Sequence, residues 1–232
     1  MRGLDHSIIF FLNQFAHRWP TFDSIIVFFS NSDLMKGGVM LGGLWFAWFS
    51  SKSHRTATSR SYLLSALLGS LIALVIARIL AHALPLRSRP ILDQSLHFRP
   101  PYGLPDQSNW TIWSSFPSDH AALFFALLTG IWLAHRRAGL VLFVYVVVAI
   151  CLPRVYIGIH YPTDILAGAV LGSGCVLACS WRSFRDLWTN PLLRWVERSP
   201  GPAYLLLFLI TFQIATLFWD LRTFLYIFDV SV

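Results

Sequence analysis

The strongest constraint on the fold is a succession of apolar segments, each about as long as a membrane is thick. A transmembrane helix needs about 20 consecutive, mainly apolar residues. Only 12% of the residues are charged and 56% are hydrophobic, whereas soluble domains carry about 25% charged residues. We therefore predict an all-α fold, a polytopic membrane helical bundle with about six transmembrane helices. The expected spans are roughly 34–50, 62–84, 119–134, 139–157, 162–181 and 203–228.

The N-terminal residues differ from these spans because polar side chains interrupt them. In residues 4–19, polar side chains such as Asp5 alternate with apolar ones, which suits a helix lying in the membrane interface. The same interruptions, with no small-residue cleavage site after them, argue against a cleavable signal peptide. The sequence does not decide whether 22–50 forms one broken helix or two. We expect a single domain over 1–232, with its core at 62–181 and an interfacial segment at 1–33.

The net charge of +7 does not indicate a nucleic-acid partner. The Lys and Arg residues cluster in short loops between apolar runs, which is the topology signal of a membrane protein. The basic loops at 51–61, 135–138 and 182–199 are expected to be cytoplasmic, so 85–117 and 153–162 lie on the outer face. Arginines there run against the positive-inside bias and indicate either an anion site or scattered surface charges. They are Arg87, Arg89, Arg99 and Arg154.

A first polar motif, Phe116-Pro117-Ser118-Asp119-His120, opens the expected span at 119–134. Serine is a favoured N-cap, and the free N–H groups and dipole of a helix start attract anions. A histidine in that first turn can act as a general acid towards a leaving group. An ordinary helix cap with a solvated histidine is the alternative.

A second polar motif runs from Pro153 to Asp164 and ends the next span. His160 precedes a helix start marked by Pro162, and Asp164 lies four residues after His160. A carboxylate at this spacing can accept a hydrogen bond from one ring nitrogen and leave the other free for attack. The planar fork of Arg154 suits phosphate oxygens. A satisfied helix start is the alternative for the His and Asp pair.

Together with Arg87-Ser88-Arg89-Pro90, these motifs bring two histidines and several guanidinium groups to one membrane face. That set predicts phosphoryl-transfer chemistry. We expect no metal and no other cofactor, because no HExxH pattern is present and the arginines would repel a cation. Cys151, Cys175 and Cys179 lie inside apolar segments and form neither a disulfide framework nor a metal pattern.

These motifs resemble the three signatures of the type 2 phosphatidic acid phosphatase superfamily of membrane lipid phosphatases, K-x6-R-P, P-S-G-H and S-R-x5-H-x3-D. The third is present as Arg154, His160 and Asp164, with Pro153 in place of serine. The second is present as Pro117 to His120, with Asp119 in place of glycine. The first keeps Arg89-Pro90, while His82 occupies the lysine position. The resemblance covers about residues 62–181.

The resemblance implies a metal-independent phosphatase. His160 would attack phosphorus to give a phosphohistidine, Asp164 would orient His160, and His120 would protonate the leaving oxygen and later activate water. The phosphate oxygens would be held by Arg89, Arg154, Ser118 and the backbone at Asp119.

The departures from the signatures lead to two further expectations. With His82 at the lysine position, either Arg87 or Arg78 would compensate, and we favour Arg87 because it lies two residues from Arg89. The side chain of Asp119 would add a negative charge beside a phosphate, so we expect it to point away from the site.

The string from Ser115 to His120 also resembles bacterial undecaprenyl pyrophosphate phosphatases of this superfamily. That implies undecaprenyl diphosphate as substrate, in a bacterial cytoplasmic membrane with the site facing the periplasm. Phosphatidylglycerophosphate, phosphatidate and lipid A phosphatases, a lipid phosphotransferase, and a non-enzymatic lipid-binding or transport protein stay open as alternatives. The oligomeric state is not predicted. The polar stretch 91–114 either covers the site or supplies interface anchors through His97, Arg99, Tyr102, Asp106, Trp110 and Trp113.

Overall fold

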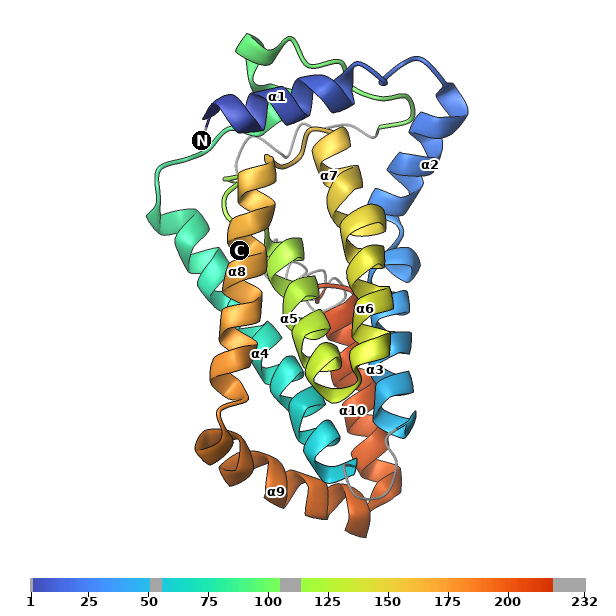
Figure 1. Ribbon diagram of the computed structural model, residues 1–232, viewed down its shortest axis with the longest axis vertical. Helices are drawn as coiled ribbons and strands as arrows, with labels where there is room; N and C mark the ends of the chain where they lie inside the picture. The colour runs from blue at the N-terminus through green and yellow to red at the C-terminus, as the bar shows by residue number, and fades with distance from the viewer. Residues whose placement is uncertain (1, 51–55, 105–113, 219–232) are drawn as a thin grey trace, which may run out of the picture.

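The regular structure is helical throughout the residues that the computed structural model describes, which are 2–50, 56–104 and 114–218. Most helices run along the long axis of an elongated bundle, as Figure 1 shows. Helix α1 (Arg2–Asn13) lies across one end of this bundle, and α9 (Arg182–Arg198) lies across the other. The predicted all-α class is therefore confirmed.

The centre of the bundle is formed by α4 (Thr56–Ala83), α5 (Asp119–Ala134) and α8 (Pro162–Cys179). Helices in a membrane gain from small residues that let backbones approach closely. At Gly168 an added Cβ would lie 2.9 Å from the Ala121 Cβ and 3.0 Å from the Ala122 nitrogen. This glycine therefore brings the start of α8 directly against the start of α5.

Three helices in the described part of the chain are long and apolar enough to cross a membrane. They are α4, the continuous segment Arg136–Tyr156 and α8, with 28, 21 and 18 residues. The middle one comprises α6 (Arg136–Tyr145), a π-helical turn η6 (Val146–Cys151) and α7 (Leu152–Tyr156). Helices α5 and α10 (Pro200–Ala215) are apolar but shorter. The chain is thus an integral membrane protein, and the larger number of about six spans stays a prediction.

The N-terminal region forms separate helices, so residues 22–50 belong to two helices and not to one broken helix. Helix α2 (Pro20–Asn31) ends at the extended residue Ser32, and a π-helical turn η1 (Leu34–Gly38) then leads into α3 (Val39–Ser50). In α1, Leu4, Phe10 and Phe11 are exposed while Asp5 is buried. An exposed apolar surface on this helix agrees with a place at the interface, which remains a prediction.

Residues 85–104 contain two short 3-10 turns, η3 (Pro90–Leu92) and η4 (Gln94–Leu96). The end of this segment is held against the N-terminal helices. The Arg99 N–H donates to Asn13 Oδ1 over 2.9 Å, and the Tyr102 N–H donates to Asp23 Oδ2 over 3.1 Å. Asp106, Trp110 and Trp113 lie outside the described residues.

The basic stretch 182–199, expected as a loop, is largely the helix α9. Its buried residues recur at helical spacing, so one face packs on the bundle, while Arg182, Arg194, Glu197 and Arg198 are exposed. The buried residues are Arg185, Thr189, Leu193 and Val196. The expected last span at 203–228 corresponds to α10 as far as Ala215, and residues from 219 onward lie outside the described part.

Candidate active site

The two polar motifs meet at a cavity of about 1000 Å³ between α2, η1, α4, α5 and the end of α7. That volume lies at the upper end of ligand pockets, which commonly enclose about 300–1000 Å³. Charged and titratable side chains are concentrated on its wall. They are Asp33, Lys36, Arg78, His82, Arg89, Asp119, His120, Arg154 and His160.

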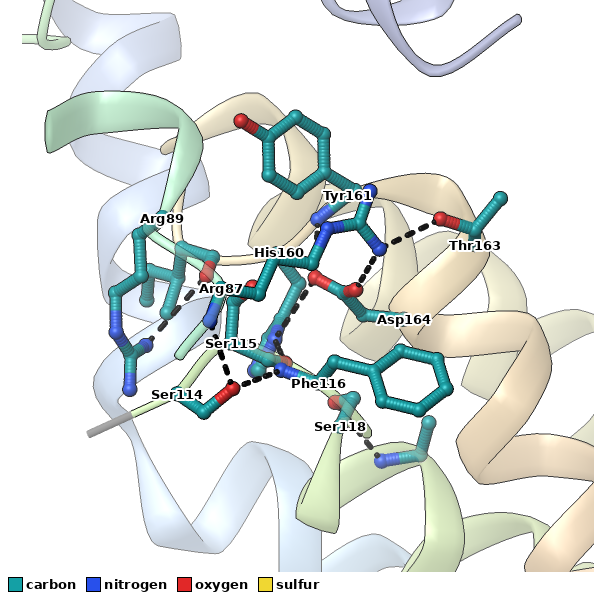
Figure 2. Close-up of polar contacts among 12 residues, drawn as sticks. Arg87, Arg89, Ser114, Ser115, Phe116, Ser118, His160, Tyr161, Thr163 and Asp164 are labelled. Carbon is teal, nitrogen blue, oxygen red and sulfur yellow. Dashed lines mark hydrogen bonds and ion pairs between the residues drawn. The ribbon is translucent and has the colours of Figure 1, made fainter. Parts of the chain in front are cut away.

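His160 is held by a tight turn between α7 and α8. Gly158 adopts a left-handed conformation with φ of 74°, where an added Cβ would lie 2.7 Å from the Phe98 ring. Beyond it, the N–H of His160 donates to the Arg154 carbonyl over 3.3 Å. The ring nitrogen Nδ1 lies 2.9 Å from the Ser115 carbonyl oxygen (Figure 2). Because a carbonyl only accepts, Nδ1 carries the proton and Nε2 keeps its lone pair for attack.

Asp164 lies close to His160, and its expected role in orienting that ring stays a prediction. Its Oδ2 lies 3.8 Å from His160 Nδ1, within reach for electrostatic attraction but beyond a hydrogen bond. The same oxygen accepts from the Tyr161 N–H over 2.8 Å. Burial lowers the pKa of His160, as do the charges of Arg154 and Arg89, while Asp164 opposes the shift. Asp164 thus lies beside the His160 ring and also fixes the start of α8.

Arg154 is the group that most directly indicates an anion site. It is only 6% exposed, and its Nε is buried without a hydrogen-bond partner. No ion pair of its side chain is found among the described residues. Burying an unpaired charge costs several kcal/mol, so a guanidinium that faces a cavity in this state is suited to bind an anion there.

The first motif places an N-cap and a histidine at the start of α5. Ser118 is the N-cap, as expected, and its Oγ accepts from the Ala121 N–H over 3.4 Å. His120 lines the cavity, with its Nδ1 2.9 Å from Asp119 Oδ1. The other carboxylate oxygen of Asp119 lies 2.6 Å from Arg78. Asp119 therefore faces the cavity instead of pointing away, and Arg78 and His120 offset its charge.

Arg87, expected to replace the missing lysine, does not line the cavity. Its guanidinium bonds to Asp164, lies 2.9 Å from Thr163 Oγ1 and 2.7 Å from Asp5 Oδ2, and stacks over the Tyr161 ring (Figure 2). The geometry therefore disagrees with a phosphate contact from Arg87. Arg78, the less favoured alternative, does line the cavity, as do Arg89 and His82.

Sequence reasoning missed two residues near this site. Lys36 lines the cavity from η1, and Asp5 reaches Arg87 from α1. Each had a signal, because Lys36 and Asp5 are charges within otherwise apolar stretches, where ionisable residues are commonly functional. By contrast, His97, Arg99 and Tyr102 from the stretch 91–114 do not line the cavity.

Comparison with known proteins supports the resemblance of the motifs. A family model described as the PAP2 superfamily matches residues 60–188. A bacitracin transport permease protein, BcrC, of Bacillus licheniformis is 35% identical over 85 residues, which cover 37% of this chain and 41% of that protein. A putative undecaprenyl-diphosphatase, YbjG, of Escherichia coli K12 is 38% identical over 65 residues, 28% of this chain and 33% of that protein. The matched part spans less than half of either relative. No solved structure matches significantly.

Proposed function

We propose that this chain, which belongs to the PAP2 superfamily, is a membrane phosphatase that hydrolyses a lipid phosphate or diphosphate through a phosphohistidine, without a metal. The observation that carries this proposal is the buried guanidinium of Arg154, which has no ion-pair partner among the described residues and shares one cavity with His120 and His160. A phosphoryl group needs several donors around its oxygens and a nucleophile in line with its leaving group.

In the first step, the lone pair of His160 Nε2 attacks phosphorus while the bond from phosphorus to the leaving oxygen breaks. The electron pair of that bond goes to the leaving oxygen, which takes a proton from His120. Arg154 and Arg89 bind the equatorial oxygens, where charge is spread in the transition state. The carbonyl of Ser115 and the charge of Asp164 stabilise the positive charge that develops on the His160 ring.

In the second step, water attacks the phosphohistidine and passes a proton to His120. The bond between nitrogen and phosphorus breaks, inorganic phosphate leaves, and His160 regains its lone pair. The contact of His120 Nδ1 with Asp119 fixes the ring orientation, so that one nitrogen serves both steps. A lipid phosphotransferase would use the same first step with an acceptor other than water.

For the substrate we propose undecaprenyl diphosphate. The name of the Escherichia coli relative points to this lipid, and the cavity volume of about 1000 Å³ exceeds what one phosphate requires. Phosphatidylglycerophosphate, phosphatidate and lipid A phosphates are the alternatives. The site lies at the start of α5, while the basic turn at 135–138 follows its other end. By the positive-inside rule, the cavity then opens to the outer side of a bacterial cytoplasmic membrane.

The test is phosphate release by the purified protein in detergent from undecaprenyl diphosphate, phosphatidate and phosphatidylglycerophosphate. We expect release to be fastest from the diphosphate and to be abolished by His160→Ala and by His120→Ala, with unfolding temperatures close to wild type. The control is His97→Asn, because His97 is exposed, lies outside the cavity and has a left-handed backbone that asparagine accepts. Full activity of His160→Ala would refute the mechanism.

A further inference from the structure

Lys36 reaches the cavity from a helical turn outside the three signature motifs. It lies in η1, a π-helical turn, and such turns are often found at functional sites. The next residue, Gly37, packs directly against the backbone of Ala215 in α10, which leaves no room for a side chain. That contact fixes η1, and the Lys36 side chain, only 8% exposed, faces the cavity.

Among the described residues that line the cavity around Lys36, cations outnumber carboxylates. The cations are Lys36, Arg78, Arg89 and Arg154, and the carboxylates are Asp33 and Asp119. Lys36 Nζ lies 3.3 Å from Asp33, but the Asp33 side chain is 52% exposed, so water weakens this pair. The charges of Lys36 and Arg154 repel each other. An anion in the cavity would remove this repulsion and neutralise the excess positive charge.

We propose that Lys36 binds the second phosphate of a diphosphate substrate, the one that stays on the lipid. This inference rests on the proposed phosphatase function. Lys36 would then supply, from a different helix, the cation that is missing at His82. When His160 Nε2 bonds to the terminal phosphorus, the bridging bond breaks and its electron pair goes to the lipid phosphate. Lys36 neutralises the charge that develops there, whereas a monophosphate has no group at this position.

The experiment compares farnesyl diphosphate with farnesyl monophosphate, which differ by one phosphate. We expect Lys36→Met to lower kcat/KM for the diphosphate by about 10- to 100-fold, the range of a charged hydrogen bond. The value for the monophosphate should change by less than about threefold, and Lys36→Arg should restore most diphosphate activity. His97→Asn, which lies outside the cavity, serves as the control and should change neither kcat/KM value.

An equal loss on both substrates, or no loss on either, would overturn the role of Lys36. Activity of His160→Ala on both substrates would instead overturn the proposed function, whatever Lys36→Met shows. If Lys36→Met does not fold, Lys36→Gln provides the same comparison with a polar side chain. The ratio of the two kcat/KM values within one sample does not depend on the folded fraction.

A separate set of contacts connects α1 to the second motif. Asp5 of α1 is only 1% exposed, and it accepts hydrogen bonds from the Thr163 N–H over 3.0 Å and from Thr163 Oγ1 over 2.6 Å. Its Oδ2 also lies 2.7 Å from the Arg87 guanidinium. Through these contacts Asp5 fixes the first turn of α8, directly after His160.

Arg87 is shared between two buried carboxylates, Asp5 and Asp164. Its guanidinium stacks over the Tyr161 ring, 4.1 Å from the centroid, and Figure 2 shows it beside Thr163 and Asp164. We infer that Asp5 is a positioning residue for His160. By taking part of the charge of Arg87, Asp5 leaves Asp164 free to attract the positive charge that develops on His160 during attack.

The test is a kinetic comparison of Asp5→Asn and Asp5→Glu. Asparagine keeps the shape but leaves the whole charge of Arg87 on Asp164, so we expect kcat to fall about tenfold with KM unchanged. Glutamate restores the charge and should recover most of kcat. Ser7→Ala is the control, because Ser7 lies on the same helix, is exposed, and its hydroxyl donates to the Gly3 carbonyl. Wild-type kcat in Asp5→Asn, or a rise in KM without loss of kcat, would overturn the inference.

Discussion

Replacing Arg154 by methionine should make the protein more stable and nearly inactive. Methionine has a similar length and no charge, so it removes a buried guanidinium that has no ion-pair partner in the described part of the chain and roughly keeps its volume. Replacement of buried charged groups by apolar residues is neutral or stabilising by about 1–4 kcal/mol, even where the charges are paired. For Arg154, 6% exposed, we expect a gain of about 1–3 kcal/mol.

This gain converts to an increase in Tm of about 2–12 °C, since 1 kcal/mol shifts Tm by about 2–4 °C in chains of 150–250 residues. At the same time kcat/KM should fall by about 100- to 1000-fold, the usual effect of removing one donor to a transition-state oxyanion. Vanadate, an analogue of the transferred phosphoryl group, should raise the Tm of the wild type and have no effect on Arg154→Met. The measurements are thermal unfolding in detergent, with and without vanadate, and phosphate release.

Arg185→Met is the matched control, because Arg185 is also buried but has partners. Its Nε lies 2.9 Å from Asp186 Oδ1, and its guanidinium stacks over the Tyr62 ring. We expect Arg185→Met to have a lower Tm than the wild type and an unchanged kcat/KM, which is the opposite of the result expected for Arg154→Met. A lower Tm for Arg154→Met would show that Arg154 has a stabilising partner. Full activity of Arg154→Met together with a raised Tm would show that Arg154 does not bind the phosphate.

Three further predictions concern pH, packing and metal. Attack requires neutral His160, whose pKa is lowered by burial, so the acid limb of kcat/KM should lie below about pH 6.5. Between the lowered pKa of His160 in the folded protein and its higher pKa in the unfolded chain, the unfolded chain binds more protons. Stability should therefore also fall as the pH drops through that window. An acid limb of kcat/KM above pH 7 would contradict the requirement for neutral His160. Gly168→Ala should lower both Tm and kcat, because the methyl group would press on α5, whereas Gly174→Ala, with open space around it, should change neither. Activity should survive prolonged EDTA treatment, and recovery only after adding a divalent cation would refute the metal-independent mechanism.

The helices and their starts could be predicted because their signals are local. Pro162 in the first turn and Ser118 at the N-cap mark the starts of α8 and α5 in the structure. The buried spacing from Arg185 to Val196 in α9 was also present in the sequence, but the abundance of arginine favoured a loop. In residues 182–199 the helical spacing of these positions is a better indicator of structure than the abundance of arginine.

The partners of charged side chains could not be predicted, because they come from distant parts of the chain. Arg87 lies two residues from Arg89 in the sequence, yet its guanidinium pairs with Asp5, 82 positions away. The spacing of His160 and Asp164 allows a hydrogen bond, but the Tyr161 N–H and Arg87 compete for the carboxylate. Which partner prevails depends on tertiary packing, for which the sequence contains no local signal.

Helix α1 and the turn η1 lie outside residues 60–188, the part that the superfamily model matches. Both nevertheless reach the site, through Asp5 and Lys36. Substrate preference could therefore change during evolution through substitutions in this N-terminal region while every signature motif stays the same. For such proteins, agreement in the motifs identifies the reaction, and the sequence before them is where differences in substrate should first be sought.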